Sequence, residues 1–193
     1  MNHLHEHGYP VPEVFSASAT EMEMARAHGP TMLTALVTDP DSMEEHIGQW
    51  VALLDRLHTI PAPDWLPRHR FADPEAPAVV LHLDLHPGNI ILTEDGPVVI
   101  DWTCARAGDA GLDAAKSYVI LAGAELPGEP NDFLATARDP MLARLRRDWD
   151  DSVVARLAAA ARDRLDGANT LDVERDRVVD HLATTFDGLA PAS

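Results

Sequence analysis

Three polar residues between positions 84 and 101 have the types and spacing to bind a divalent cation and to accept a proton. Asp84 and Asn89 lie five residues apart in one polar stretch, and Asp101 follows the apolar run Val98–Ile100. Two carboxylates and an amide oxygen suit a hard cation such as Mg²⁺, which prefers oxygen ligands and retains several waters. A carboxylate beside that cation can accept a proton from a hydroxyl nucleophile.

The elements around these residues should bring them to one edge of the structure. The loop that carries Asp84 follows the apolar run Val79–Leu81. Two further β-type runs, Asn89–Thr93 and Pro97–Asp101, are joined by Glu94-Asp95-Gly96. Asp-Gly at such a join is a strong hairpin signal. Both polar clusters therefore sit at strand ends, where the three side chains can converge.

This segment resembles the catalytic loop and metal-binding strand of the aminoglycoside phosphotransferase family, kinase-like enzymes that phosphorylate small molecules. That family has a His-x-Asp-x-x-x-x-Asn loop, followed after a hairpin by an Ile-Asp-Trp or Ile-Asp-Phe strand end. Here His82, Asp84 and Asn89 match the loop, and Ile100-Asp101-Trp102 matches the strand end. The resemblance covers residues 9–125 well and the C-terminal helices loosely.

The resemblance implies a role for each matching residue. Asp84 would be the catalytic base that orients and deprotonates the acceptor hydroxyl. Asn89 and Asp101 would hold Mg²⁺, or Mn²⁺ in its place, on the phosphates of ATP. His82 would brace the loop rather than transfer protons. The implied reaction moves the γ-phosphate of ATP to a hydroxyl of a small molecule, and it depends mainly on positioning and charge neutralisation.

The implied fold is α+β and mainly helical, a protein-kinase-like large (C-terminal) lobe with a remnant of the small lobe. Residues 1–26 would form the small-lobe remnant and the linker. Residues 27–193 would form the large lobe, with the catalytic loop, the metal strand and the C-terminal helices. Backbone groups of Glu23, Met24 and Ala25 would face adenine as cofactor-binding residues.

The sequence departs from the family pattern inside and ahead of the catalytic loop. Leu83 stands where the family usually has glycine. Lys116 is the only lysine and lies after the metal strand, so it is not the phosphate-binding lysine of a small lobe. No glycine-rich segment precedes Gly8. We therefore expect the chain from Met1, as a truncated member, to bind ATP weakly and to be a poor or inactive kinase.

A small-lobe remnant of this kind should also expose apolar surface. We expect Val11, Val14 and Phe15 to be uncovered, which would favour self-association or a partner that supplies further strands.

Patterns elsewhere predict the supporting elements. Ser42 and Glu45 have capping-box spacing at the start of an amphipathic helix that ends near His58. Five prolines make residues 59–78 an irregular loop. Gly167 and Gly188 are expected to end helices. The other expected elements are a helix end closed by Gly8, strands at Glu13–Ser16 and Thr20–Met24, and helices over 110–123, 140–166 with a break near 150–152, and 173–187.

Four residues beside the metal strand have more specific interpretations. Asp109 and Asp113 should cap the following helix and tie it to the catalytic loop. Cys104 is either a reactive thiol or, as we favour, a small packed side chain. Arg106 either contacts phosphate or pairs with Asp109.

Composition restricts the partners. Of the charged residues 32 are acidic and 15 basic, giving a formal net charge of −17, which argues against nucleic acid and anionic membranes as partners. An acidic chain would suit a cationic acceptor. A single cysteine, no apolar run of membrane-spanning length and no secretory signal indicate a cytoplasmic protein.

Two other functions use the same residues. A catalytically inactive pseudokinase module would bind nucleotide or a partner without turnover. A metal-dependent hydrolase would instead use His82, Asp84 and His86 as transition-metal ligands. That second alternative leaves the spacing of Asn89 and the strand end at Asp101 unexplained.

Overall fold

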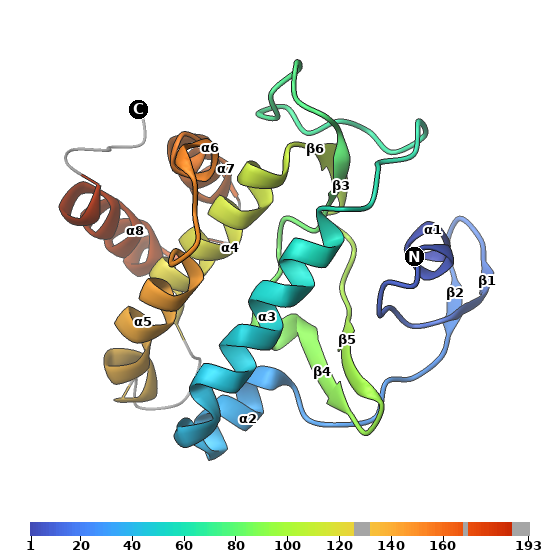
Figure 1. The fold of residues 1–193 in the computed structure, drawn as a ribbon, viewed down its shortest axis with the longest axis horizontal. Helices are drawn as coiled ribbons and strands as arrows, with labels where there is room; N and C mark the ends of the chain where they lie inside the picture. Colours follow the sequence, from blue (N-terminus) through green and yellow to red (C-terminus); the bar gives the residue numbers. More distant parts are fainter. Residues whose placement is uncertain (126–131, 168–169, 187–193) are drawn as a thin grey trace.

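The computed structural model describes residues 1–125, 132–167 and 170–186. These residues fold into a mixture of helices and short strands, about half of it helical. Figure 1 shows the C-terminal helices gathered on one side of helix α3 and the short strands on its other side. This arrangement agrees with the predicted mixed α and β class.

The elements follow one another in an irregular order along the chain. The helices are α1 (Asn2–Glu6), α2 (Met32–Thr38), α3 (Met43–Leu57), α4 (Ala110–Gly123), α5 (Asp132–Leu145), α6 (Asp151–Val154), α7 (Leu157–Leu165) and α8 (Asp172–Thr185), with short 3₁₀ turns η1 (Pro40–Ser42) and η2 (Pro87–Asn89). The strands are β1 (Val14–Ala17), β2 (Met22–Met24), β3 (Val79–Leu81), β4 (Ile90–Thr93), β5 (Gly96–Val99) and β6 (Arg106–Gly108). They pair as three antiparallel two-stranded sheets, β1–β2, β3–β6 and β4–β5.

The N-terminal segment folds back onto α3. The predicted helix end is confirmed, with Gly8 at a φ of 71°, a value that favours glycine. Tyr9 is buried, and its hydroxyl donates a hydrogen bond to the carbonyl of Leu53. Val11 is also buried, so the prediction that it would be uncovered is wrong, because this segment joins the main core. Val14 is half-buried rather than uncovered, and Phe15 is 60% exposed, as predicted.

The two predicted N-terminal strands are confirmed as the hairpin β1–β2. Met22 and Met24 of β2 are exposed together with Phe15 of β1, so this hairpin carries apolar surface. Figure 1 places the hairpin at one end of the molecule. Self-association through it stays a prediction, as does the boundary between the two predicted domains.

The segment before α3 differs from its prediction in two ways. The helix α2 was not predicted; Thr31 caps it by accepting a hydrogen bond from the Thr34 N–H, and Met32 and Leu36 are buried. The predicted capping box of α3 is wrong, because Ser42 belongs to the turn η1 and donates its hydroxyl to the carbonyl of Asp39.

The core lies between α3, the strands and α4. The apolar stripe of α3 is buried as predicted, including Ile47, Trp50 and Leu57. Helix α4 is buried on nearly all sides, which agrees with a sequence that is apolar around most of its circumference. It contacts α5, α6, α7, α8 and β3. α4 is therefore the centre of the helical side in Figure 1.

The predicted hairpin after the loop 82–89 is confirmed. β4 and β5 pair from Ile90 with Val99 to Thr93 with Gly96, which leaves Glu94 and Asp95 as the two-residue turn. Strand β6 was not predicted and pairs with β3. Its three residues are too few to show the alternation by which strands are detected in a sequence.

The C-terminal helices differ from their predictions in the position of α5, which ends at Leu145, and in a second break, between Val154 and Leu157, that was not predicted. Helix α5 begins at Asp132 rather than near 140 and continues through Pro140. The predicted break is confirmed, since Asp150 caps α6 through the N–H groups of Ser152 and Val153. Gly167 follows the end of α7 as expected. Gly188 lies outside the described residues. No helix within the described ranges is long and apolar enough to cross a membrane.

Candidate active site

The loop after β3 brings Asp84 and Asn89 into contact. The Asn89 Nδ2 donates to the carbonyl oxygen of Asp84 at 2.9 Å and to its Oδ2 at 3.3 Å. The backbone N–H of Asn89 donates to the carbonyl of His86, which closes the turn η2. The amide therefore fixes both the backbone and the carboxylate of Asp84.

His82 is buried, and both of its ring nitrogens are hydrogen-bonded. Its Nδ1 accepts from the backbone N–H of Asp84 at 3.2 Å. The other nitrogen, Nε2, must then carry the proton that it donates to the carbonyl of Ile100, 3.0 Å away. The ring packs against Trp102 with the centroids 4.5 Å apart. His82 therefore connects the loop to the end of β5.

Asp101 is positioned through the residue that precedes it. The N–H of Ile100 donates to the carbonyl of Asn89, and the Ile100 carbonyl accepts from His82. The carboxylate of Asp101 itself is exposed and accepts from the Thr103 hydroxyl at 2.7 Å. Asp101 is thus held beside the loop by backbone contacts, with its side chain directed to solvent.

His86 lies next to the carboxylate of Asp84. Its Nδ1 accepts from the N–H of Gly88 at 3.1 Å, and its Nε2 is 3.9 Å from Asp84 Oδ2. Burial lowers the pKa of His86 below its usual value, although the charge of Asp84 acts in the opposite direction. The neutral ring is therefore favoured at this position.

Asp113 anchors the loop from beneath, as predicted. Its carboxylate is fully buried and accepts from the backbone N–H groups of His82 at 3.0 Å and Leu83 at 2.7 Å. It also lies 3.1 Å from the Nε2 of His58, a partner that the sequence did not indicate. One buried carboxylate of α4 thus holds the backbone just ahead of Asp84.

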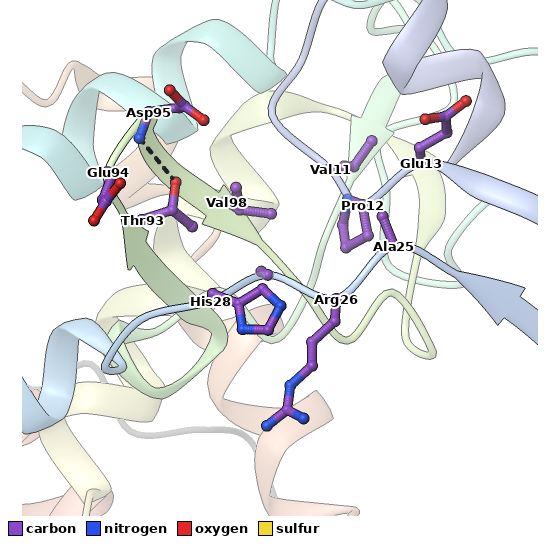
Figure 2. A pocket seen from close by; sticks show the side chains of 11 residues that line it. Val11, Pro12, Glu13, Ala25, Arg26, His28, Thr93, Glu94, Asp95 and Val98 are labelled. Carbon is purple, nitrogen blue, oxygen red and sulfur yellow. Dashed lines mark hydrogen bonds between the residues drawn. The ribbon is translucent and has the colours of Figure 1, made fainter.

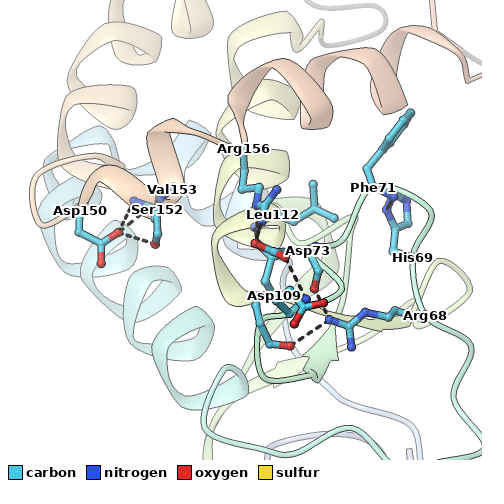
Figure 3. A network of polar contacts seen from close by, with 12 residues as sticks. Arg68, His69, Phe71, Asp73, Asp109, Leu112, Asp150, Ser152, Val153 and Arg156 are labelled. Carbon is cyan, nitrogen blue, oxygen red and sulfur yellow. Dashed lines mark hydrogen bonds and ion pairs between the residues drawn. The ribbon is translucent and has the colours of Figure 1, made fainter.

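Asp109 caps α4, also as predicted, and joins a wider network (Figure 3). It accepts from the N–H of Leu112 at 3.1 Å, from the N–H of Asp73 at 2.8 Å and from Arg156 Nε at 3.0 Å. The predicted pair between Arg106 and Asp109 is wrong, because the carboxylate is already paired with Arg156.

Leu83 adopts a left-handed backbone conformation with a φ of 64°. This explains why the family usually has glycine there, since a Cβ in this region costs about 1–2 kcal/mol. The side chain of Leu83 is only 5% exposed, so its burial offsets that cost.

We expect Leu83→Gly to be more stable than Leu83→Ala by about 1 kcal/mol. Both variants lose the buried side chain, but only glycine also relieves the strained φ. Urea unfolding of both proteins measures the difference. Leu85 is fully buried without a positive φ, so the same pair of substitutions there should show alanine as the more stable variant. Alanine ranking above glycine at both positions would contradict the prediction.

A cavity of about 400 Å³ opens beside Asp84 and was not predicted. Its lining combines the loop that carries Leu83 and Asp84 with the segment before β6 and with α4 and α7. Cys104 lies in this lining and is exposed, so the prediction that it would be a packed side chain is wrong. Lys116 also lines the cavity. The one feature of the sequence that distinguished this residue was that it is the only lysine.

The linker region forms a separate cavity of about 510 Å³ (Figure 2). Ala25 lines it together with Pro12, His28 and Val98. The N–H of Ala25 donates to the carbonyl of Glu13 at 2.8 Å, so it is used within the linker's own pairing. Glu23 and Met24 lie in β2 and are exposed. That these three residues face adenine stays a prediction.

The geometry does not favour the transition-metal alternative. Both ring nitrogens of His82 bond to protein groups, so neither is available as a ligand. In the parts of the chain that the structure describes, no cluster of three or more His, Cys, Asp or Glu residues could hold a metal. Asn89 and Asp101 instead offer an amide oxygen and a carboxylate, a donor pair that suits a hard cation keeping part of its water shell.

The fold and site together define a mixed α and β protein whose polar centre lies on a loop between a strand and a hairpin. A comparison with known protein families matches residues 62–164 to the phosphotransferase enzyme family. The match spans more than half of the 193 residues, so the chain belongs to this family and the predicted resemblance is confirmed. A search of curated proteins returned no match.

Proposed function

We propose that this chain transfers the γ-phosphate of ATP to a hydroxyl group of a small molecule. The observation that carries the proposal is the pair Asp84 and Asn89, locked together and connected through Ile100 to Asp101. In this proposal residues 27–193 act as a kinase-like large lobe, and residues 1–26 act as a small-lobe remnant and linker.

Asp84 acts as the base. Its side chain is about 30% exposed, so a substrate hydroxyl can reach it, and Asn89 restricts its orientation. The acceptor hydroxyl donates a hydrogen bond to the carboxylate and transfers its proton as the oxygen attacks phosphorus. The ring of His82 acts only as a support, because both of its nitrogens are engaged.

Asn89 and Asp101 would hold Mg²⁺. Because Asn89 Nδ2 faces Asp84, its Oδ1 is left for a cation, and Asp101 brings a full charge at an exposed position. When bound, Mg²⁺ and ATP supply the phosphoryl group and part of the charge neutralisation. The protein residues keep the acceptor oxygen and the phosphate in line, which is most of what phosphoryl transfer requires.

A direct assay tests the proposal. Purified chain is incubated with radiolabelled ATP, Mg²⁺ and a panel of small alcohols and hydroxy acids, and labelled products are separated. Acceptor-dependent, Mg²⁺-dependent transfer supports the proposal. Nucleotide binding with no transfer to any acceptor would instead support the inactive binding module.

We expect Asp101→Asn to weaken Mg²⁺-dependent ATP binding at least about tenfold, because the only full charge proposed for the metal is lost. Asn89→Ala should have a smaller effect, since it removes a neutral oxygen. Calorimetry with Mg-ATP measures both. Asp41→Asn is the control, because Asp41 is exposed in η1 and carries the same charge. An equal loss in the control variant would show a general charge effect and contradict the assignment.

A further inference from the structure

The cavity beside Asp84 borders the proposed metal site, because Thr103 in its lining donates a hydrogen bond to Asp101. Its lining includes Leu83 and Asp84 from the catalytic loop but neither Asn89 nor Asp101. In a phosphotransferase the acceptor must reach the base from a side that the metal and phosphates do not occupy. At about 400 Å³ the cavity has room for a small polyol or sugar acid.

Most of the charge in the cavity wall is already compensated. Lys116 of α4 forms an ion pair with Asp163 of α7. Asp163 also lies 3.3 Å from His69 Nε2 and 3.3 Å from Arg70 Nη2. Burial would raise the pKa of Asp163, but the bonds from His69 and Lys116 hold it well below its usual value. The charge of the Asp163 carboxylate is therefore already compensated by protein donors, so it does not favour a cationic ligand.

Two charged groups in the wall remain uncompensated, the carboxylate of Asp84 and the guanidinium of Arg106, and the proposed function already assigns Asp84 to the acceptor hydroxyl. Arg106 lines the cavity, and among the described residues its guanidinium donates only to the carbonyl of Ala105. Within the described residues it has no carboxylate partner. Arg164 pairs with Glu174 through Nη2 at 3.3 Å, and no other described residue engages its remaining N–H groups, which are left for a ligand. Two arginines with N–H groups left for a ligand thus line a cavity in a chain whose net charge is −17.

Carboxylate and phosphate groups match these donors. A guanidinium binds a planar carboxylate through two parallel N–H bonds, which gives both affinity and orientation. Asp84 would at the same time receive the hydroxyl of the same molecule. A cationic acceptor would instead meet Arg106, Arg164 and Lys116, and only Asp84 would lack a compensating partner in the wall.

We infer that this cavity is the acceptor site and that it selects a hydroxyl compound bearing an anionic group, with Arg106 as the specificity-determining residue. The inference rests on the proposed function for the identity of the reaction. The substrate class differs from the cationic acceptor that the acidic composition suggested. Overall charge describes the whole surface, whereas selection depends on the few side chains that line the cavity.

Occupancy of this cavity can be measured without turnover. Cys104 is the only cysteine, is exposed and lines the cavity, so a bound molecule should slow its alkylation by iodoacetamide, a neutral reagent. Two sets of matched probes differ in charge at constant size: glycerate, glycerol and serinol, and gluconate, sorbitol and glucamine. Each is tested as the ratio of the alkylation rates with and without the probe, in the absence of ATP.

We expect the acids to protect Cys104 at least about fivefold more strongly than the alcohols and amines of the same size. Arg106→Gln should abolish that preference. Arg147→Gln should retain it, because Arg147 pairs with Glu44 away from the cavity and its loss changes the net charge equally. Protection by the amines as strong as by the acids, protection by neither acid, or equal loss in both variants would overturn the inference.

A second assay separates this inference from the proposed function. The same six compounds are offered as acceptors with radiolabelled Mg-ATP. Protection by acids without phosphoryl transfer to any compound would count against the proposed function and leave the anion site standing. Transfer to the amines or alcohols, with no protection by the acids, would overturn the anion site and leave the proposed function standing.

Discussion

Asp84→Asn is expected to lower the rate of phosphoryl transfer about 10³-fold without changing the stability of the fold. The substitution keeps the shape of the side chain but removes its ability to take the proton of the acceptor hydroxyl. Asp84 is partly exposed and contributes no core packing, so thermal unfolding should be unaffected. Initial rates at saturating Mg-ATP and acceptor, with thermal melting of both proteins, measure the two effects.

The neighbouring amide provides the matched comparison. Asn89→Asp should also lower the rate, since it replaces the donor to Asp84 by a second carboxylate that repels it. Asp41→Asn, far along the chain in η1, should keep the wild-type rate. Full transfer activity in Asp84→Asn would exclude this residue as the base. A loss of activity that tracks a lower melting temperature would assign it a structural role.

Local patterns were sufficient to predict the elements that carry the site. The turn Glu94-Asp95 is followed at once by Gly96, whose φ of 117° favours glycine, and these local preferences are sufficient to predict the pairing of β4 with β5. Asp109 was predictable as a helix cap for a similar reason, because its partner Leu112 lies three residues away. Where a structural element is determined by contacts within a few residues, it can be predicted from the sequence.

The predicted capping box at Ser42 is wrong because two local structures compete for this residue. The spacing of Ser42 and Glu45 is compatible with a capping box, but Pro40 fixes a 3₁₀ turn that includes Ser42. A cap residue needs an extended backbone, and Ser42 has a φ of −76° and a ψ of 0°. Its hydroxyl therefore bonds backward to Asp39 instead of forward into α3.

The cavity could not be predicted because its lining comes from distant parts of the chain. Lys116 and Asp163 are separated by 47 residues and meet only when α4 and α7 pack together. The same applies to His58, which reaches Asp113 across 55 residues. Helix packing creates these contacts, and neither spacing nor composition describes it. The charge of the cavity wall depends on the first of these contacts, because Lys116 and Asp163 both line the cavity.

Asp113→Ala is expected to destabilise the fold by about 3 kcal/mol or more, which makes it the largest stability effect among the site residues. The substitution leaves the backbone N–H groups of His82 and Leu83 buried without an acceptor, and it removes the partner of His58. Each unpaired buried donor costs about 1–3 kcal/mol. Urea unfolding at neutral pH measures the difference. Asp150→Ala, which removes an exposed helix cap, should cost much less.

Asp113 also predicts how stability depends on pH. Burial alone would raise the pKa of this carboxyl, but the hydrogen bond and charge of His58 and the bond from His82 hold it below its usual value. A folded-state pKa below the unfolded value means that the stabilisation is complete above about pH 4 and is lost as the pH falls further. The wild type should therefore lose stability steeply below about pH 4, and Asp113→Ala less steeply. The free energy of unfolding of both proteins is measured as the pH is lowered. An equally steep loss of stability in the wild type and in Asp113→Ala would contradict this role of Asp113. Because the same carboxylate holds the backbone ahead of Asp84, phosphoryl transfer in Asp113→Ala should fall even where the variant is fully folded.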